Sequence, residues 1–152
     1  MHALQHMTYR RPVDGADLPS GTETILLVDD EEPVRYVVRE ILERRGYRVL
    51  TACDGPAGLR VSSDFQGPIH LLVTDIVMPR MNGFEVAKFV TAERPSIKIL
   101  YMSGYLQTVG FDQERLLSGQ YFLAKPFLCP TLARKVREVL DGPSMSRKPF
   151  LE

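Results

Sequence analysis

The sequence has little cysteine, no excess of charge of either sign and no long apolar run. Its two cysteines, Cys53 and Cys129, form no CxxC pair and no Cys/His cluster, so neither a disulfide framework nor a zinc site is indicated. We expect two reduced and mostly buried thiols. Lys+Arg and Asp+Glu number 19 each, so no net field attracts nucleic acid or anionic lipid.

The apolar runs are all too short to cross a bilayer, which requires about 20 residues. Residues 1–22 lack the apolar core of a signal peptide. We therefore expect a soluble, cytoplasmic protein. With 152 residues, of which 44% are hydrophobic and 25% charged, the chain suits one globular domain with a substantial core.

The two ends of the chain differ from its middle. Residues 1–22 and 142–152 are rich in proline, glycine and polar residues and show no sustained hydrophobic period, which predicts a flexible leader or linker and a flexible tail. Residues 23–141 would form the single domain.

Within residues 23–141, short apolar runs alternate with amphipathic segments. Continuous apolar runs are typical of strands buried on both faces of a parallel sheet. Pro, Gly and acidic residues mark the ends of the helices. The expected strands are 24–28, 47–52, 69–75, 96–103 and 121–125. The expected helices begin near Pro33, Pro56, Phe84 and Pro130, and a further helix is expected at about 113–117. This order predicts an α/β fold of the flavodoxin-like doubly wound (βα)5 kind, a five-stranded parallel sheet with helices on both faces.

Polar side chains stand where the expected strands end: Asp29 and Asp30, then Asp75, Ser103 and Lys125. In open α/β sheets, ligands bind outside the carboxyl ends of the strands. Charged groups there are costly unless they are paired or hold a cation. Clustered carboxylates suit Mg²⁺, an ammonium adds positive charge, and a hydroxyl can donate a hydrogen bond. The set is typical of phosphoryl transfer to a carboxylate.

The motifs around these residues resemble a known signature. The pair DD at 29–30, the D-x-x-M-P-x-M-N-G run at 75–83, Ser103-Gly104 and Lys125-Pro126 resemble bacterial two-component response-regulator receiver domains over about residues 23–141. The runs MSGY and AKPF are similar to those in receivers of hybrid histidine kinases.

The resemblance implies roles for the matching positions. Asp75 would be the phosphoacceptor, attacking a phosphohistidine. Asp30 would bind Mg²⁺ (or Mn²⁺) directly and Asp29 largely through water, with Asp75 and the backbone carbonyl of Val77 as further ligands. Lys125 would contact the phosphoryl group.

Three further positions match the family with some departures. Ser103 would be the switch hydroxyl, in place of the more frequent threonine. Phe122 stands where the family has its rotating aromatic residue but lacks a tyrosine hydroxyl, and packing in the core is its plainer interpretation. Pro126 follows the lysine where the family often has a cis peptide bond.

The implied function is a phosphorelay module. A histidine kinase or histidine phosphotransfer protein would donate the phosphoryl group, and the face of helix four, strand five and helix five would then be recognised by a downstream protein. The module would catalyse only its own phosphorylation and dephosphorylation, without direct contact with nucleic acid or membrane. It would be either a stand-alone receiver or part of a hybrid histidine kinase.

Three alternatives remain. A pseudo-receiver would bind partners without phosphorylation, although the full acidic set argues against it. An aspartyl phosphohydrolase would carry a D-x-D arrangement, whereas Ile76 and Val77 follow Asp75 here. A flavin-binding domain would need a Ser/Thr/Gly-rich phosphate loop, where this chain has DDEEP at 29–33.

Overall fold

A computed structural model describes residues 18–104 and 121–143. Its centre is one parallel sheet in the order β2-β1-β3-β4-β5. The strands are β1 (Thr24–Val28), β2 (Arg48–Ala52), β3 (Leu71–Asp75), β4 (Lys98–Gly104) and β5 (Tyr121–Lys125). The helices are α2 (Glu32–Arg44), α3 (Gly55–Asp64), α4 (Gly83–Glu93) and α7 (Cys129–Asp141). The expected doubly wound α/β fold is confirmed, and the helix expected at 113–117 lies outside the described residues.

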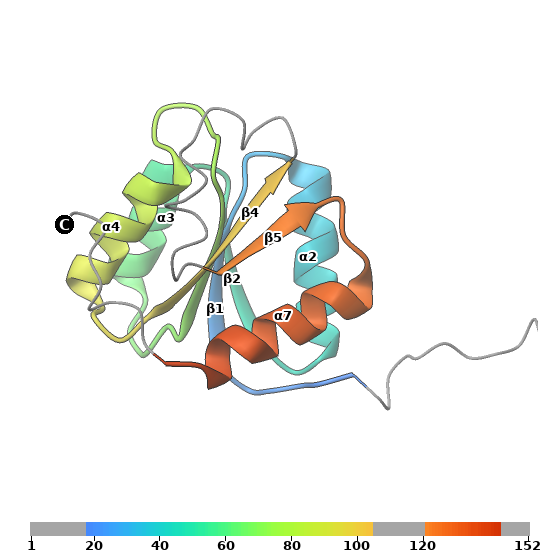
Figure 1. Ribbon diagram of the computed structural model, residues 1–152. Coiled ribbons are helices and arrows are strands. Elements are labelled where there is room, and N and C mark those ends of the chain that lie inside the picture. The colour runs from blue at the N-terminus through green and yellow to red at the C-terminus, as the bar shows by residue number, and fades with distance from the viewer. Residues whose placement is uncertain (1–17, 105–120, 144–152) are drawn as a thin grey trace, which may run out of the picture.

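Helices cover both faces of the sheet (Figure 1), with α2 and α7 on one face and α3 and α4 on the other. Successive residues of a strand point to opposite faces. Ile25 and Leu27 of β1 therefore pack under α2 and α7, whereas Leu26 and Val28 pack under α3 and α4. A strand with a core on each side has no polar face, which explains the continuous apolar runs in the sequence.

Two helices begin at side-chain caps beside the carboxyl edge of the sheet. Asn82 accepts the N–H of Glu85 at 2.9 Å, and the Glu85 carboxylate accepts the N–H of Asn82 at 2.9 Å, which completes a capping box for α4. Asp54 accepts the Ala57 N–H at 2.9 Å at the start of α3 and pairs with Arg80 at 2.6 Å. The backbone N–H of Ala57, and then Arg80, lower the pKa of Asp54. The Arg80 pair thus joins the loop after β3 to the start of α3.

One expectation is wrong: Cys53 and Cys129 are exposed rather than buried. Cys53 directly follows the last residue of β2, and Cys129 opens α7. Both lie where the chain leaves the core at the carboxyl edge of the sheet, so the apolar character of a thiol does not decide its burial there. Among the residues that the structure describes, no helix has the length and apolarity needed to cross a membrane.

Candidate functional site

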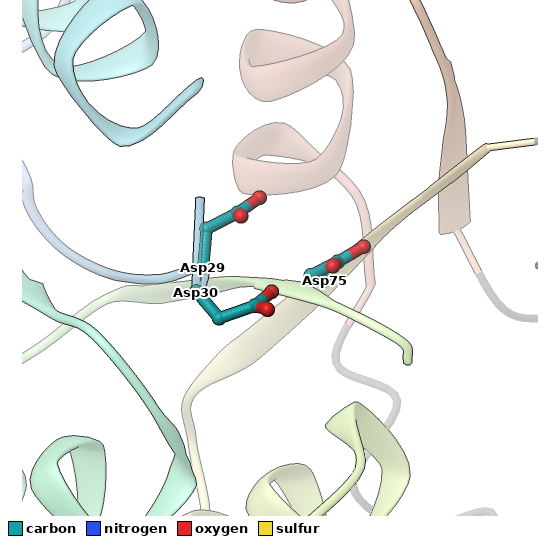
Figure 2. A group of neighbouring side chains, drawn as sticks. All are labelled: Asp29, Asp30 and Asp75. Carbon is teal, nitrogen blue, oxygen red and sulfur yellow. The ribbon is translucent and has the colours of Figure 1, made fainter. Parts of the chain in front are cut away.

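An acidic cluster lies at the carboxyl edge of the two central strands. Asp29 and Asp30 follow β1, and Asp75 ends β3, which is paired with β1. One carboxylate oxygen from each of the three residues lies within 4.8 Å of the others (Figure 2). Asp29 and Asp75 are buried and Asp30 is exposed. The cluster therefore opens to solvent on the side of Asp30.

A single lysine from the far edge of the sheet reaches this cluster. The Nζ atom of Lys125 lies 3.2 Å from Asp29 Oδ2 and 3.4 Å from Asp75 Oδ1. It also lies 3.5 Å from Glu31 Oε1. Because β5 pairs with β4 and not with β3, the lysine side chain must extend across β4 to make these contacts.

The cluster holds more negative charge than this lysine can offset. Burial raises the pKa of Asp75 to about 6, with Lys125 opposing the rise and Asp29 adding to it. Burial likewise raises the pKa of Asp29. Burial disfavours the charged form of Lys125, but Asp29 and Asp75 outweigh this effect and raise the pKa of the lysine. The ammonium stays charged, while the buried carboxylates would be stabilised by further positive charge.

Two buried polar atoms at the site make no hydrogen bond of good geometry within the described part of the chain: Asp75 Oδ1, which has only its ion pair with Lys125, and Ser103 Oγ. A buried polar atom without a partner costs free energy, so native proteins rarely keep one without a reason. A ligand that contacts both atoms would remove this cost. The oxygen-only set of Asp29, Asp30 and Asp75 fits a hard divalent cation such as Mg²⁺.

The loop after β3 is held tightly against the strand. The Gly83 N–H donates to the carbonyl oxygen of Ile76 at 2.8 Å. A Cβ atom at Gly83 would collide with the carbonyl oxygen of Asp75, so this position requires glycine for close approach. Within the loop, the Val77 side chain is exposed and Met78 is buried. The start of α4 is thereby fixed against the end of β3.

Ser103 and Phe122 share a face of the sheet. In the parallel pairing of β4 with β5, Tyr101 lies beside Phe122 and Ser103 beside Ala124, so both pairs point to the side of α3 and α4. Phe122 is partly buried against that core. The peptide bond between Lys125 and Pro126 is cis.

Sequence reasoning did not identify two neighbours of the cluster, Glu31 and Arg35. The Glu31 N–H donates to Asp29 Oδ1 at 2.9 Å, and Arg35 Nη1 donates to the backbone carbonyl of Asp29 at 2.7 Å. The Glu31 N–H and Lys125 therefore fix the orientation of the Asp29 carboxylate, whereas Arg35 holds the Asp29 backbone. The sequence held a sign of this neighbour, because Arg35 lies one helical turn after Glu31.

Comparison with known proteins agrees with this geometry. The family model described as "Response regulator receiver domain" matches residues 25–137. The chain is 34% identical over 132 residues to the sensor kinase CckA of Brucella abortus (strain 2308), covering 86% of this chain and 14% of that protein. It is 31% identical over 117 residues to the response regulator receiver protein CpdR of the same organism, covering 76% of this chain and 95% of that protein.

The solved structures give the same result. The crystal structure of the receiver domain from the hybrid histidine kinase CckA superposes with a TM-score of 0.65 at 31% identity, covering 78% of this chain and 99% of that one. The chain spans only a small part of the length of the CckA sensor kinase of Brucella abortus, 14% of that protein. From its motifs, its sheet and these relatives, the chain belongs to the response regulator receiver domain family of two-component systems.

Proposed function

We propose that this receiver domain accepts a phosphoryl group on Asp75 from a phosphohistidine of a histidine kinase or histidine phosphotransfer protein in the cytoplasm. The observation that carries the proposal is the state of the Asp75 carboxylate. It is buried, lies between two further aspartates and Lys125, and has an oxygen atom without a hydrogen-bond partner in the described residues. A structural carboxylate would not be left in this state.

The chain's own groups suit the transfer step. Burial raises the pKa of Asp75 to about 6, so at neutral pH most of the carboxylate is ionised and can act as the nucleophile. Its oxygen forms the new bond to phosphorus while the bond from phosphorus to the histidine nitrogen breaks, and the electron pair stays on the imidazole. The Lys125 ammonium, 3.4 Å from Asp75 Oδ1, is placed to offset the charge of the phosphoryl oxygens.

A divalent cation, Mg²⁺ or Mn²⁺, fits the acidic cluster. Asp29, Asp30, Asp75 and the backbone carbonyl of Val77 would hold it, and it would offset negative charge on the carboxylates and on the phosphoryl group. Asp30 is the exposed member of the cluster and is therefore the first that the cation meets from solvent.

The response to phosphorylation would begin at Ser103. Its buried hydroxyl has no partner among the described residues, so it can donate a hydrogen bond to the phosphoryl group without breaking another bond. Phe122 lies on the same face of the sheet and would respond by repacking. The surface recognised by a downstream protein would comprise β5 and α7 together with the helix expected at 113–117, which lies outside the described residues.

Exposed apolar side chains beside the site suit the approach of the phosphodonor. Tyr36 and Val37 of α2 are 62% and 49% exposed, and Leu128, which precedes α7, is 72% exposed. The two helices lie side by side on one face of the sheet (Figure 1). A helix of the donor lying across them would bring its phosphohistidine to the open side of Asp75.

The decisive experiment is phosphorylation of the full chain by acetyl phosphate with Mg²⁺, followed by intact-mass measurement. We expect the mass of one phosphoryl group on the wild type and on the control Asp64→Ala, which removes an exposed carboxylate at the end of α3. We expect none on Asp75→Ala, and none on the wild type when EDTA replaces Mg²⁺. Equal labelling of Asp75→Ala would show that Asp75 is not the phosphoacceptor.

The same experiment separates the receiver from a pseudo-receiver. A pseudo-receiver would remain unmodified with acetyl phosphate and Mg²⁺, and its amide NMR spectrum would not change when beryllofluoride and Mg²⁺ are added. We expect instead that beryllofluoride shifts the amide resonances of Asp75, Ser103 and Lys125 in the wild type.

A further inference from the structure

The segment before β1 lies against the amino edge of the sheet, opposite the edge that carries Asp75 (Figure 1). Leu18 is buried there. The Gly21 N–H donates to the carbonyl oxygen of Arg45 at 3.0 Å, and Arg45 Nε donates to the carbonyl oxygen of Pro19 at 3.1 Å. Residues 18–23, which we call the strap, are therefore bound to the turn between α2 and β2.

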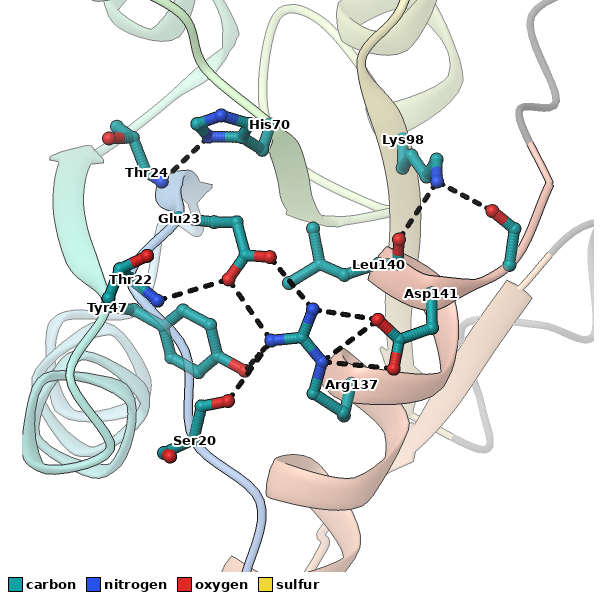
Figure 3. Close-up of polar contacts among 11 residues, drawn as sticks. Ser20, Thr22, Glu23, Thr24, Tyr47, His70, Lys98, Arg137, Leu140 and Asp141 are labelled. Atoms are coloured by element: carbon teal, nitrogen blue, oxygen red, sulfur yellow. Dashed lines mark hydrogen bonds and ion pairs between the residues drawn. The ribbon is translucent and has the colours of Figure 1, made fainter.

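A second arginine attaches the strap to α7. Arg137 donates to Glu23 Oε2 at 2.8 Å and Oε1 at 3.1 Å, and to the carbonyl oxygen of Ser20 at 3.1 Å (Figure 3). The same guanidinium donates to Tyr47 Oη at 3.1 Å and to Asp141 Oδ1 at 2.8 Å. One side chain thus joins the strap, the residue preceding β2 and the end of α7.

The ion pair between Arg137 and Glu23 is partly buried and does not lie free on the surface. The side chains of Arg137 and Glu23 are 23% and 25% exposed. Hydrogen bonding to Arg137 lowers the pKa of Glu23 and of Asp141, and both carboxylates raise the pKa of Arg137. A planar guanidinium that pairs with two carboxylates in a partly buried position holds its partners in a fixed geometry.

Two glycines lie where the strap crosses the turn. A Cβ atom at Gly21 would collide with the side chains of Arg137, Glu23 and Tyr47. At Gly46, where φ is +102°, a Cβ atom would collide with the carbonyl oxygen of Gly21. The Gly46 backbone therefore lies closer to the strap than another residue would allow, whereas a Cβ atom at Gly21 would displace the ends of the three side chains.

The end of α7 has a second attachment nearby. Lys98 Nζ, from the first residue of β4, donates to the carbonyl oxygens of Leu140 at 2.9 Å and Gly142 at 2.6 Å. Gly142 is the C-cap residue of α7, so these bonds satisfy backbone groups that a helix end leaves free. The last turn of α7 is therefore held between β4 on one side and the strap on the other.

We propose that the amino edge of the domain is a docking surface for residues 18–23 of the same chain, and that Arg137 couples this strap to the last turn of α7. Coupling between two sites is reciprocal, so release of the strap loosens the end of α7. This coupling requires no phosphorylation.

Hydrogen exchange of the full chain tests the coupling without phosphodonor or divalent cation, so the result is independent of the proposed function. We expect Arg137→Met to speed amide exchange about tenfold at Gly21 in the strap and at Gly142 after α7, because both lose their common anchor. Arg134→Met is the matched control. Arg134 is exposed on the same helix and forms no hydrogen bond or ion pair with any described residue, so neither segment should change.

Glu23→Gln separates coupling from a purely local contact, since it leaves α7 unaltered and removes only the charge on the strap. We expect faster exchange at both Gly21 and Gly142, by a smaller factor than in Arg137→Met. Faster exchange in the strap alone would overturn the coupling, and no change in either segment would overturn the docking. If Arg134→Met sped exchange at Gly21 and Gly142 as much as Arg137→Met does, the change would come from the overall charge of α7. That result would also overturn the proposal.

Discussion

The two edges of the sheet both gather charged side chains, with opposite electrostatic results. At the carboxyl edge, burial raises the pKa values of Asp29 and Asp75. At the amino edge, Arg137 lowers the pKa values of Glu23 and Asp141. The carboxylates are therefore destabilised as ions at one edge and stabilised as ions at the other.

The opposite pKa shifts at the two edges result from differences in burial and in the number of cationic donors. Asp29 and Asp75 are fully buried and share one ammonium, which also faces Glu31. At the amino edge the carboxylates keep access to water, and the guanidinium of Arg137 offers each of them its own N–H donors. A ligand site retains uncompensated charge that its ligand later offsets, whereas a structural contact is complete without a ligand.

Removal of the lysine should give the largest effect. We expect Lys125→Met to lower the free energy of unfolding by about 3 kcal/mol near neutral pH in EDTA, because Asp29 and Asp75 stay buried without their cation. Urea denaturation measures the change, and millimolar Mg²⁺ should restore part of the loss. Lys88→Met, which removes an exposed lysine of α4, is the control. A loss no larger than that of the control would contradict the comparison.

Removal of the charge at Asp75 should stabilise the fold in a pH-dependent way. The pKa of Asp75 is about 6 in the folded protein and near 3.8 when unperturbed, so the folded state binds the proton more tightly. The contribution of Asp75 to the stability is therefore largest below pH 3.8, falls as the pH rises from 3.8 to about 6, and stays low above that.

Asp75→Asn lacks this titration. In EDTA we expect it to be more stable than the wild type by about 2 kcal/mol above pH 7, with the gain vanishing near pH 4. Thermal unfolding across this pH range measures the difference. In excess Mg²⁺ the stability difference between Asp75→Asn and the wild type should shrink. A stability difference that does not depend on pH would show that burial of the Asp75 charge is not its cause.

At the amino edge we expect a smaller effect that depends on neither pH nor cation. Lys98→Met removes the donor to the carbonyl oxygens of Leu140 and Gly142 and should cost about 1 kcal/mol. The loss should be equal with Mg²⁺ and with EDTA, and constant between about pH 5 and 8, because no buried carboxylate is left unpaired. Sensitivity of this loss to Mg²⁺ would remove the distinction between the two edges.

Much of the fold could be predicted because a buried strand and a helix start leave local signals. The runs at 24–28 and 121–125 coincide with β1 and β5, and the helices expected near Pro33, Pro56 and Pro130 each begin one residue earlier. The exposure of Cys53 and Cys129 was not predictable from their chemistry, since their positions at the carboxyl edge of the sheet, after β2 and at the start of α7, decided it. The third helix was expected to begin near Phe84, just after Gly83, and the close approach of Gly83 to Asp75 appears only in three dimensions.

The sequence by itself determined which residues end the strands, and so which edge of the sheet carries Asp29, Asp30, Asp75, Ser103 and Lys125. Periodicity and chain order are local properties, and they suffice for that inference. Only the tertiary structure decided which of these groups touch. Lys125 meets Asp29 across 96 positions of the chain, and Arg137 meets Glu23 across 114. Such contacts depend on the strand order and on the packing of α7, because the free energy of burying a charge is set by every group around it and not by its neighbours in sequence.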